Sequence, residues 1–586
     1  MDAFAANGGL LSLVIFLPAL GALAVLAVRS VDAIRWVSLA VTSVAFVLSL
    51  FLLFGFDPAV STAAAPQMGT KALWFGSVDI SYYVGVDGLN ILLLLLTTLL
   101  GPIVVLSSWT YIGKAHKGYY ALILLLETGV LGVFAAFDLF LFYVFFELTL
   151  IPMVFIIGIW GGEERVYAAI KFVLYTLVGS LLMLVGVIWL GFQAGDAVNG
   201  GVFTTDWYKL VQFGVPLSAQ WGLFAVFGLA FAIKVPLFPL HTWLPDAHTQ
   251  APTGGSVVLA GVLLKMGTFG LLKFVVPFFP NASAAAAPYI GILAVVGIVY
   301  GALVAFAQTD VKKLVAYSSV SHLGFVVLGI FAFTTEAVQG ALIQMVNHGI
   351  STGALFLIIG MMVERRHTRA MADYGGIAKT VPILTFMMLF SVFASAGLPG
   401  LNGFVGEFMI LVGSFGSSIP GYALLTVLAT TGVIFAAVYL LWMVYKTFFG
   451  EVTDEANKTM KDLNGREIGL LMPLIVLMVW LGMGPAPFLE LSERSVRSVL
   501  ETSEAKAGAV LAAAKDLDTS PIVVPIAWPD EAAVAATLAP TPPSAPVSSS
   551  GGAHGAEDAH DADASSTHGA DESESYDDDS DSHDAE

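Results

Sequence analysis

Long apolar runs recur along almost the whole chain, and they constrain its fold more than any other feature. A run of about twenty apolar residues spans a bilayer as a helix, because only a backbone with internally satisfied hydrogen bonds is stable in hydrocarbon. The sequence therefore predicts an all-α polytopic membrane protein with about 14 transmembrane helices. We place them near residues 10–28, 34–54, 89–109, 119–136, 138–160, 167–193, 221–242, 253–277, 287–306, 313–333, 337–362, 383–414, 421–449 and 467–489.

The composition excludes several other classes of protein. Hydrophobic residues make up 57% of the 586 residues and charged residues 12%, too few polar groups to cover a soluble globule of this size. The chain has no cysteine, which rules out disulfides, thiolate metal sites and iron–sulfur clusters within it. Glycine-rich nucleotide-binding loops are also missing from the sequence. We expect no cofactor and no metal site in this chain, so any redox chemistry must lie in partner proteins.

The negative charge is concentrated at the C-terminal end. The formal net charge is -19, but residues 516–586 hold seventeen Asp or Glu and no Lys or Arg. The other 515 residues combine 27 acidic with 25 basic side chains, so the membrane part is nearly neutral and has no basic face for nucleic acid. We predict an acidic disordered tail over 516–586 and an interfacial amphipathic helix over 490–515.

The loop charges predict the orientation. Lys and Arg between the predicted helices fall almost entirely in one set of alternating loops, and the opposite set holds only Lys71 and Lys209. The first set is therefore expected to be cytoplasmic, and the even helix count then puts both termini outside. The first apolar run has no basic segment before it, so we interpret it as a retained helix and not as a signal peptide.

The helices divide into blocks. Two blocks of five helices have their corresponding loops on opposite sides of the membrane, which suggests an inverted repeat. The fourth helix of each block is interrupted, near Pro236 and Pro239 in the first and between Leu398 and Phe404 in the second. The predicted organisation is three N-terminal helices with an external loop over 1–118, repeats over 119–277 and 287–449, and a last transmembrane helix over 467–489.

Ionisable side chains fall inside these apolar runs, where a charge costs about 2.5–3.5 kcal/mol. Five of them are predicted at one depth near the helix midpoints: Glu147, Lys234, Lys265, His322 and His348. Glu407 is predicted nearer the external face. Burial and ion pairing act oppositely on the protonation of a lysine or carboxylate, and histidine titrates near neutrality. The sequence therefore predicts a row of proton carriers that begins at a Glu147–Lys234 pair.

Other polar residues keep two interpretations. Lys273 lies near the end of its run, where we expect its side chain to reach the interface. Glu127 is either a structural hydrogen-bond partner or a proton site. His241, Asp246 and His248, at the cytoplasmic end of the broken helix, either admit protons or cap the turn.

Several segments resemble a known family. They are F-Y-V-F-F-E at 142–147, H-T-W-L-P-D-A-H-T-Q-A-P-T-G-G-S at 241–256, T-D-V-K-K-L-V-A-Y-S-S-V-S-H-L-G at 309–324 and L-P-G-L-N-G-F-V-G-E-F at 398–408. These segments resemble the M-subunit family of respiratory NADH–quinone oxidoreductase (complex I), whose members are antiporter-like membrane subunits. The acidic residue at Glu407 is the feature that favours this family over the related subunits L and N, which carry lysine there.

The resemblance implies fourteen helices with two inverted repeats and a role for each ionisable residue. Glu147 would modulate Lys234, Lys265 would be the central lysine, His322 and then His348 would connect it onward, and Glu407 would be the outward terminal group. It also implies a translocase whose flavin, iron–sulfur clusters and quinone lie in other subunits, with the antiporter-like subunits L and N as partners in a bacterial inner (plasma) membrane. The alternatives are a stand-alone or multisubunit cation/proton antiporter, or a hydrogenase-associated antiporter-like subunit.

Overall fold

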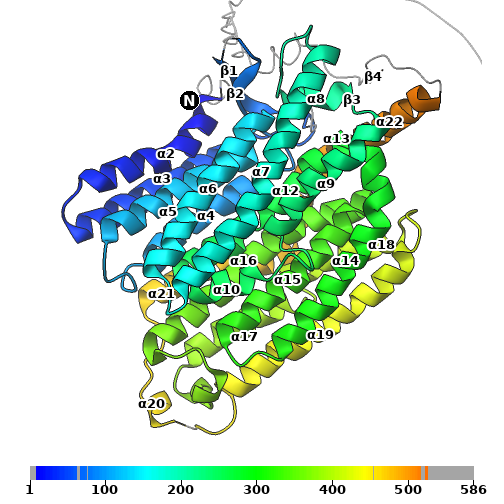
Figure 1. The fold of residues 1–586 in the computed structure, drawn as a ribbon. Coiled ribbons are helices and arrows are strands. Elements are labelled where there is room, and N and C mark those ends of the chain that lie inside the picture. Colours follow the sequence, from blue (N-terminus) through cyan, green and yellow to red (C-terminus); the bar gives the residue numbers. More distant parts are fainter. Residues whose placement is uncertain (1–7, 62–65, 76, 453, 516–521, 525–586) are drawn as a thin grey trace, which may run out of the picture. The chain divides into compact units, whose positions relative to one another are not determined.

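The computed structural model describes residues 8–61, 66–75, 77–452, 454–515 and 522–524. All of them belong to one compact unit, Met1–Thr541, shown in Figure 1. The second unit, Pro542–Glu586, lies outside the described residues. The prediction of a disordered tail over 516–586 therefore falls outside the described residues, except at residues 522–524.

The predicted class, an all-α polytopic membrane protein, is confirmed. Among the described residues, twelve helical segments are long and apolar enough to cross a membrane. They are α2 (Gly9–Ala27), α3 (Val31–Gly55), α5 (His116–Ala135), α6 (Leu139–Trp160), α7 (Arg165–Val198), α9 (Leu217–Lys234), the composite segment Thr253–Phe278, α14 (Pro280–Phe306), α15 (Val311–Ile330), α16 (Thr335–Arg366), α19 (Tyr422–Phe448) and α21 (Gly465–Met483). Shorter apolar helices are α4 (Ile91–Ser107), α17 (Pro382–Ser395) and α18 (Asn402–Phe415). The count of fourteen and the inverted repeat stay predictions.

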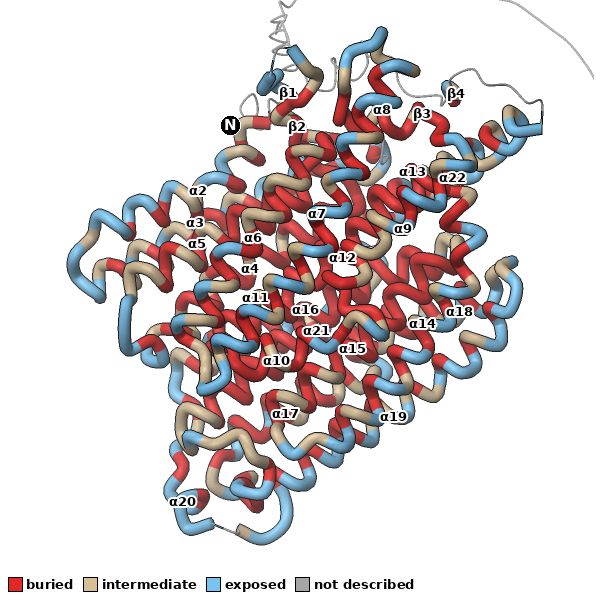
Figure 2. The backbone as a smooth tube through the Cα atoms, in the orientation of Figure 1, coloured by how far each residue is buried: buried red, intermediate tan, exposed pale blue. Residues whose placement is uncertain are grey.

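Burial follows the pattern expected in a bilayer. The outer helices α7 and α19 expose apolar side chains, such as Leu174 and Leu424, that would be unfavourable against water. The central helices α15 and α16 are buried nearly all round, as Figure 2 shows by their red colour. The polar side chains inside this bundle therefore depend on one another for hydrogen bonds.

Both predicted helix interruptions are present. α9 ends at Lys234, and a turn leads to the short helix α10 (Trp243–Gln250), because Pro236 and Pro239 cannot donate backbone hydrogen bonds to a continuing helix. α17 ends at Ser395 and α18 begins at Asn402. Between them Gly397 and Gly400 adopt positive φ angles of 75° and 92°, which glycine adopts without strain. Lys234 thus lies at a helix end, not at the middle of a helix over 221–242 as predicted.

The buried segment Thr253–Phe278 is not a regular α-helix. It consists of α11 (Thr253–Val258), the π-helical stretch η1 (Leu259–Leu263), α12 (Lys265–Gly270), a second π-helical stretch η2 (Leu271–Val275) and α13 (Val276–Phe278). In η1 the Leu264 amide donates to the Leu259 carbonyl, five residues back, at 3.3 Å. Such π turns are rare, and they frequently occur at functional sites.

The loop between α3 and α4 contains a β-hairpin that was not predicted from the sequence. Strand β1 (Gln67–Phe75) pairs antiparallel with β2 (Ile80–Val86). Two ion pairs join this hairpin region to α8 (Trp207–Gln212) and its N-cap residue: Lys71 to Asp206 at 2.6 Å, and Lys209 to Asp79 at 2.9 Å. The two basic residues that were predicted in the external loops are thus both paired with acids.

The predicted amphipathic helix over 490–515 is present as α22 (Ala486–Lys515). It packs against α16, where Gln339 donates to the Leu489 carbonyl at 2.9 Å, and it buries Val496, Val499 and Lys506. Beyond it, β4 (Ile522–Val523) pairs with β3 (Phe213–Gly214), although no order was predicted there. The composition of the tail could not predict this strand, because its partner lies far away in the sequence.

Lys506 generates a prediction about α22. Its ammonium is fully buried and contacts the Leu210 carbonyl at 3.4 Å, and burial lowers the pKa of Lys506 to about 7. Docked α22 therefore binds fewer protons than undocked α22 between this pKa and the ordinary value of 10.5, so docking should strengthen as pH rises through that window. Hydrogen–deuterium exchange over 486–515, corrected for intrinsic rates, should slow with rising pH. Lys506→Met should remove this effect, whereas the exposed-site control Lys515→Met should retain it.

Candidate functional site

Lys265 is the central ionisable group of the bundle. It is the first residue of α12, two residues after the end of η1, and its side chain is fully buried. Its Nζ contacts the carbonyl of Ala260 in η1 and lies 2.7 Å from Nδ1 of His348 on α16. The π stretch thus supplies one partner and a facing helix the other, so the lysine is hydrogen-bonded without any carboxylate.

His348 leads from Lys265 to a second hydrogen-bonded pair. The imidazole rings of His348 and His322, on α16 and α15, have centroids 5.9 Å apart. His322 Nδ1 in turn lies 2.8 Å from Glu407 Oε1 on α18, and its Nε2 is 3.3 Å from the Tyr439 hydroxyl of α19. The spatial order is therefore Lys265, His348, His322, Glu407. The predicted order of the two histidines was wrong, because equal depth in the membrane does not say which helix is the nearer neighbour.

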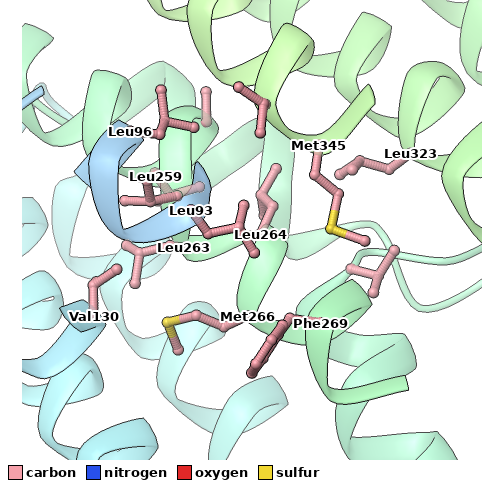
Figure 3. Packing of buried hydrophobic residues seen from close by; sticks show 14 of the residues in the cluster. Leu93, Leu96, Val130, Leu259, Leu263, Leu264, Met266, Phe269, Leu323 and Met345 are labelled. Atoms are coloured by element: carbon pink, nitrogen blue, oxygen red, sulfur yellow. The ribbon is translucent and has the colours of Figure 1, made fainter. Parts of the chain in front are cut away.

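The chain neighbours of Lys265 belong to the apolar core. Figure 3 shows part of this core, with Leu264 and Met266, which flank Lys265 in the sequence, and Met345 of α16. All three side chains are fully buried. A hydrogen bond in such low-dielectric surroundings is electrostatically stronger than one in water. Loss of the contact between Lys265 and His348 would therefore cost more free energy here than at the protein surface.

Polar side chains that sequence reasoning missed surround Glu407. Gln344 of α16 donates to Glu407 Oε1 at 3.1 Å. One turn away, Asn347 donates to the Asn402 carbonyl at 2.7 Å, and Asn402 donates back to the Asn347 carbonyl at 3.2 Å. The side-chain oxygens of Asn347 and Asn402 have no hydrogen-bond partner among the described residues. Buried oxygens of this kind are suited to water, so polar lining continues beside Glu407.

Lys234 and Glu147 do not form an ion pair in this structure. Lys234 is buried at the end of α9, with its Nζ 5.0 Å from the ring centre of Phe146 and 5.6 Å from that of Phe172. Glu147 of α6 is half-buried, and among the described residues it makes no contact with Lys234 within 4.0 Å, although its charge acts on that ammonium through space. The structure therefore places these two predicted partners in one region but apart.

The short helix α10 lies between the break after α9 and the central row. Asp246 forms an ion pair with Lys171 of α7 at 2.7 Å. His241 and His248 are both buried, and neither ring nitrogen of either residue has a partner among the described residues. His248 stacks on Phe356 of α16 at 4.5 Å and lies close enough to Lys265 and His348 for their charges to interact.

Lys273 does not reach the membrane interface, and that prediction was wrong. Its side chain is fully buried in η2 and pairs with fully buried Asp87 at 2.5 Å. Its ammonium also lies 3.8 Å from the ring centre of Phe137 and 4.5 Å from that of Trp207. Asp87 lies in the turn before α4, four residues ahead of Ile91, and also accepts from the amides of Leu89 and Asn90. The sequence signal that could have indicated the Asp87–Lys273 pair was the acidic Asp87 at the start of the apolar run 89–109.

A bundle of apolar helices with a buried row of ionisable groups beside interrupted helices is characteristic of ion-translocating membrane proteins. Residues 136–434 match the family described as NADH:quinone oxidoreductase/Mrp antiporter, TM. The chain is 44% identical over 519 residues to NADH-quinone oxidoreductase subunit M of Rhodobacter capsulatus, covering 85% of this chain and 98% of the relative. It belongs to this family, within the group of M subunits, and the resemblance stated above is confirmed.

Solved structures agree with this assignment. A chain of respiratory complex I from Thermus thermophilus with bound NADH superimposes with a TM-score of 0.74 at 34% identity, covering 85% of this chain and 99% of that one. A chain of the Mrp complex from Dietzia sp. DQ12-45-1b gives a TM-score of 0.71 at 20% identity, covering 84% and 99%. The second likeness shows a shared fold alone.

The Asp87–Lys273 pair generates a stability prediction. Asp87→Asn keeps an acceptor for the turn but leaves the Lys273 ammonium without its counter-charge, which should destabilise the protein by about 3–5 kcal/mol. We expect a lower thermal unfolding midpoint and less assembled protein in detergent. Asp87→Asn combined with Lys273→Met removes both charges and should recover most of the loss. A single variant as stable as the unaltered protein would contradict this account.

Proposed function

We propose that this chain is a proton-translocating membrane subunit of a respiratory NADH–quinone oxidoreductase in a bacterial inner membrane. The observation that carries the proposal is the buried row from Lys265 through His348 and His322 to Glu407, in a chain of the M-subunit family. Flavin, iron–sulfur clusters and quinone would lie in other subunits. The antiporter-like subunits L and N would be membrane neighbours, and both termini would be external.

Translocation would begin at Glu147 and Lys234. A signal from a neighbouring subunit, generated by quinone reduction, would change the separation of these two charges. Pairing favours the protonated lysine, and separation inside an apolar environment favours release of its proton. The structure supports this step by having the two groups apart, with the Lys234 ammonium facing aromatic rings.

The proton would then move along the central row. Lys265 would accept it and pass it to His348 across the 2.7 Å contact between Nζ and Nδ1. A water or a ring rotation would bridge the 5.9 Å between the two imidazoles, and His322 would deliver the proton to Glu407 across 2.8 Å. Moving one charge against 100 mV costs about 2.3 kcal/mol, which a change of a few pKa units in the carriers can supply.

Uptake and release would occur at opposite ends of this row. His248 and the Lys171–Asp246 pair on the α10 side would admit protons from the cytoplasm toward Lys265, which their position beside the break after α9 supports. Gln344, Asn347 and Asn402 would hold water beside Glu407 for release to the outside, which the unpartnered oxygens of Asn347 and Asn402 support. The alternative interpretation, that the α10 residues only cap the turn, predicts hydrogen bonds from their side chains to the backbone. Neither ring nitrogen of His248 makes one among the described residues.

A cation/proton antiporter, alone or in a multisubunit or hydrogenase-associated complex, is the second candidate. The Mrp likeness favours it at the level of the fold. Glu407 would then have to bind a cation such as sodium, yet its Oε1 accepts hydrogen bonds from an imidazole and a carboxamide. An imidazole partner suits proton exchange better than the oxygen coordination that hard cations require.

Two substitutions test the relay. Lys234→Ala removes the proposed switch and Glu407→Gln removes the terminal acceptor, so either should lower NADH-driven proton pumping in vesicles by on the order of 10²-fold. The amount of assembled complex should stay unchanged. The matched control Lys446→Ala, at an exposed lysine of α19, should pump normally. Normal pumping in both relay variants would overturn the proposal.

Co-purification separates the two candidate functions. Gentle solubilisation of the intact membrane should yield this chain together with subunits that carry flavin and iron–sulfur clusters, detected by their absorption spectra. The same particle should oxidise NADH with a quinone acceptor. A chain that migrates without redox subunits and exchanges sodium for protons in vesicles would establish the antiporter function instead.

A further inference from the structure

Glu127 is a buried carboxyl group that the proposed relay does not use. It lies on α5, and only 6% of the residue is exposed. Neither of its carboxyl oxygens has a hydrogen-bond partner among the described residues. A Cβ at Gly101 of α4 would lie 2.7 Å from Glu127 Oε1, so the glycine makes room for the carboxyl group. A structural hydrogen-bond role, one of the two interpretations from the sequence, therefore has no partner to support it.

The carboxyl group lines a small cavity of about 20 Å³ between α4, α5 and the start of the composite segment. A cavity of this size accommodates about one water molecule. The groups that face Glu127 are uncharged and do not titrate: Thr97, Leu100, Gly101 and Val104 from α4, and Val258 and Val262 from α11 and η1. An ionised carboxylate without a counter-charge here would be very costly, which favours the neutral acid with its proton in place.

The π-helical stretch η1 contributes one residue to the cavity and another to the surroundings of Lys265. Val262 of η1 lines the cavity, and Ala260 of η1 offers the carbonyl that Lys265 contacts. The backbone is closely packed at this point, since a Cβ on Gly349, the residue after His348, would lie 2.7 Å from the Gly261 carbonyl. A change in η1 would therefore affect the surroundings of Glu127, Lys265 and His348 together.

We propose that Glu127 is a further proton-holding group of the relay, which exchanges its proton with Lys265 through water in the cavity beside η1. In this step the O–H bond of the carboxylic acid breaks, its proton passes to the water, and the water gives a proton to the neutral amine of Lys265. The products are a carboxylate and an ammonium, so net charge is conserved. The inference rests on the proposed function of the row.

The test uses the complete complex, with Glu127→Gln as the main variant and Glu127→Asp as the matched control that keeps an acid. Glu127→Gln should lower NADH-driven pumping about tenfold. It should also remove one carbonyl band of a protonated carboxylic acid from the infrared difference spectrum recorded on reduction. Glu127→Asp should retain the band at a shifted position.

Gly101→Ala provides a second variant that keeps the glutamate. Its methyl group would enter the space beside Oε1, so the infrared band should shift even if Glu127→Gln fails to assemble. A difference spectrum in which Glu127→Gln and Gly101→Ala leave every carboxylic acid band unchanged would overturn the proposal, whatever their pumping rates. Normal pumping in both Lys234→Ala and Glu407→Gln would instead contradict the proposed function, so the two failures can be told apart.

Discussion

The cost of an ammonium group inside hydrocarbon is the constraint on which the centre of this protein depends. Lys265 is fully buried and has no carboxylate within hydrogen-bond reach among the described residues; its partners are a carbonyl and an imidazole. A regular α-helix keeps its interior carbonyls for its own amides. The π-helical stretch η1 changes that pairing, which lets Ala260 accept from the lysine that follows it. The irregular backbone is thus part of the solution to a buried charge.

The same constraint explains where the other interruptions lie. Lys234 ends α9 at the break before α10, and Glu407 lies in α18 just after the break that follows α17. Interrupted helices leave backbone N–H and C=O groups without helical hydrogen-bond partners and make space for water. Membrane proteins tolerate such non-helical backbone only where it is buried in protein or faces a water-filled cavity. The charged members Lys234, Lys265 and Glu407 therefore lie at or beside irregular backbone, while His322 and His348 lie on the regular helices α15 and α16.

Much of this could be predicted from the sequence. Apolar runs indicated the membrane helices, prolines and glycines indicated both breaks, and helix midpoints brought Lys265, His322 and His348 to one depth. Depth alone could not order the two histidines, because the order depends on which helices touch. The π stretches and the β-hairpin were missed for a related reason: a π turn has the composition of an α-helix, and a short hairpin between long apolar runs carries a weak pattern. The pairing of Asp87 with Lys273 spans 186 residues, so only the folded chain reveals it.

Lys265 and Lys273 show how partners decide what a buried lysine can do. They lie on one helical segment, both are fully buried, and each follows or belongs to a π stretch. Lys273 faces a carboxylate at 2.5 Å and two aromatic rings, so its partner is an acid that supplies a counter-charge. Lys265 faces an imidazole that can itself take up a proton. An ion pair holds a helix in place, and a lysine–histidine contact allows a proton to move. In the proposed relay, the difference between the structural Lys273 and the proton-carrying Lys265 therefore lies in the second residue of each pair, since both lysines are fully buried.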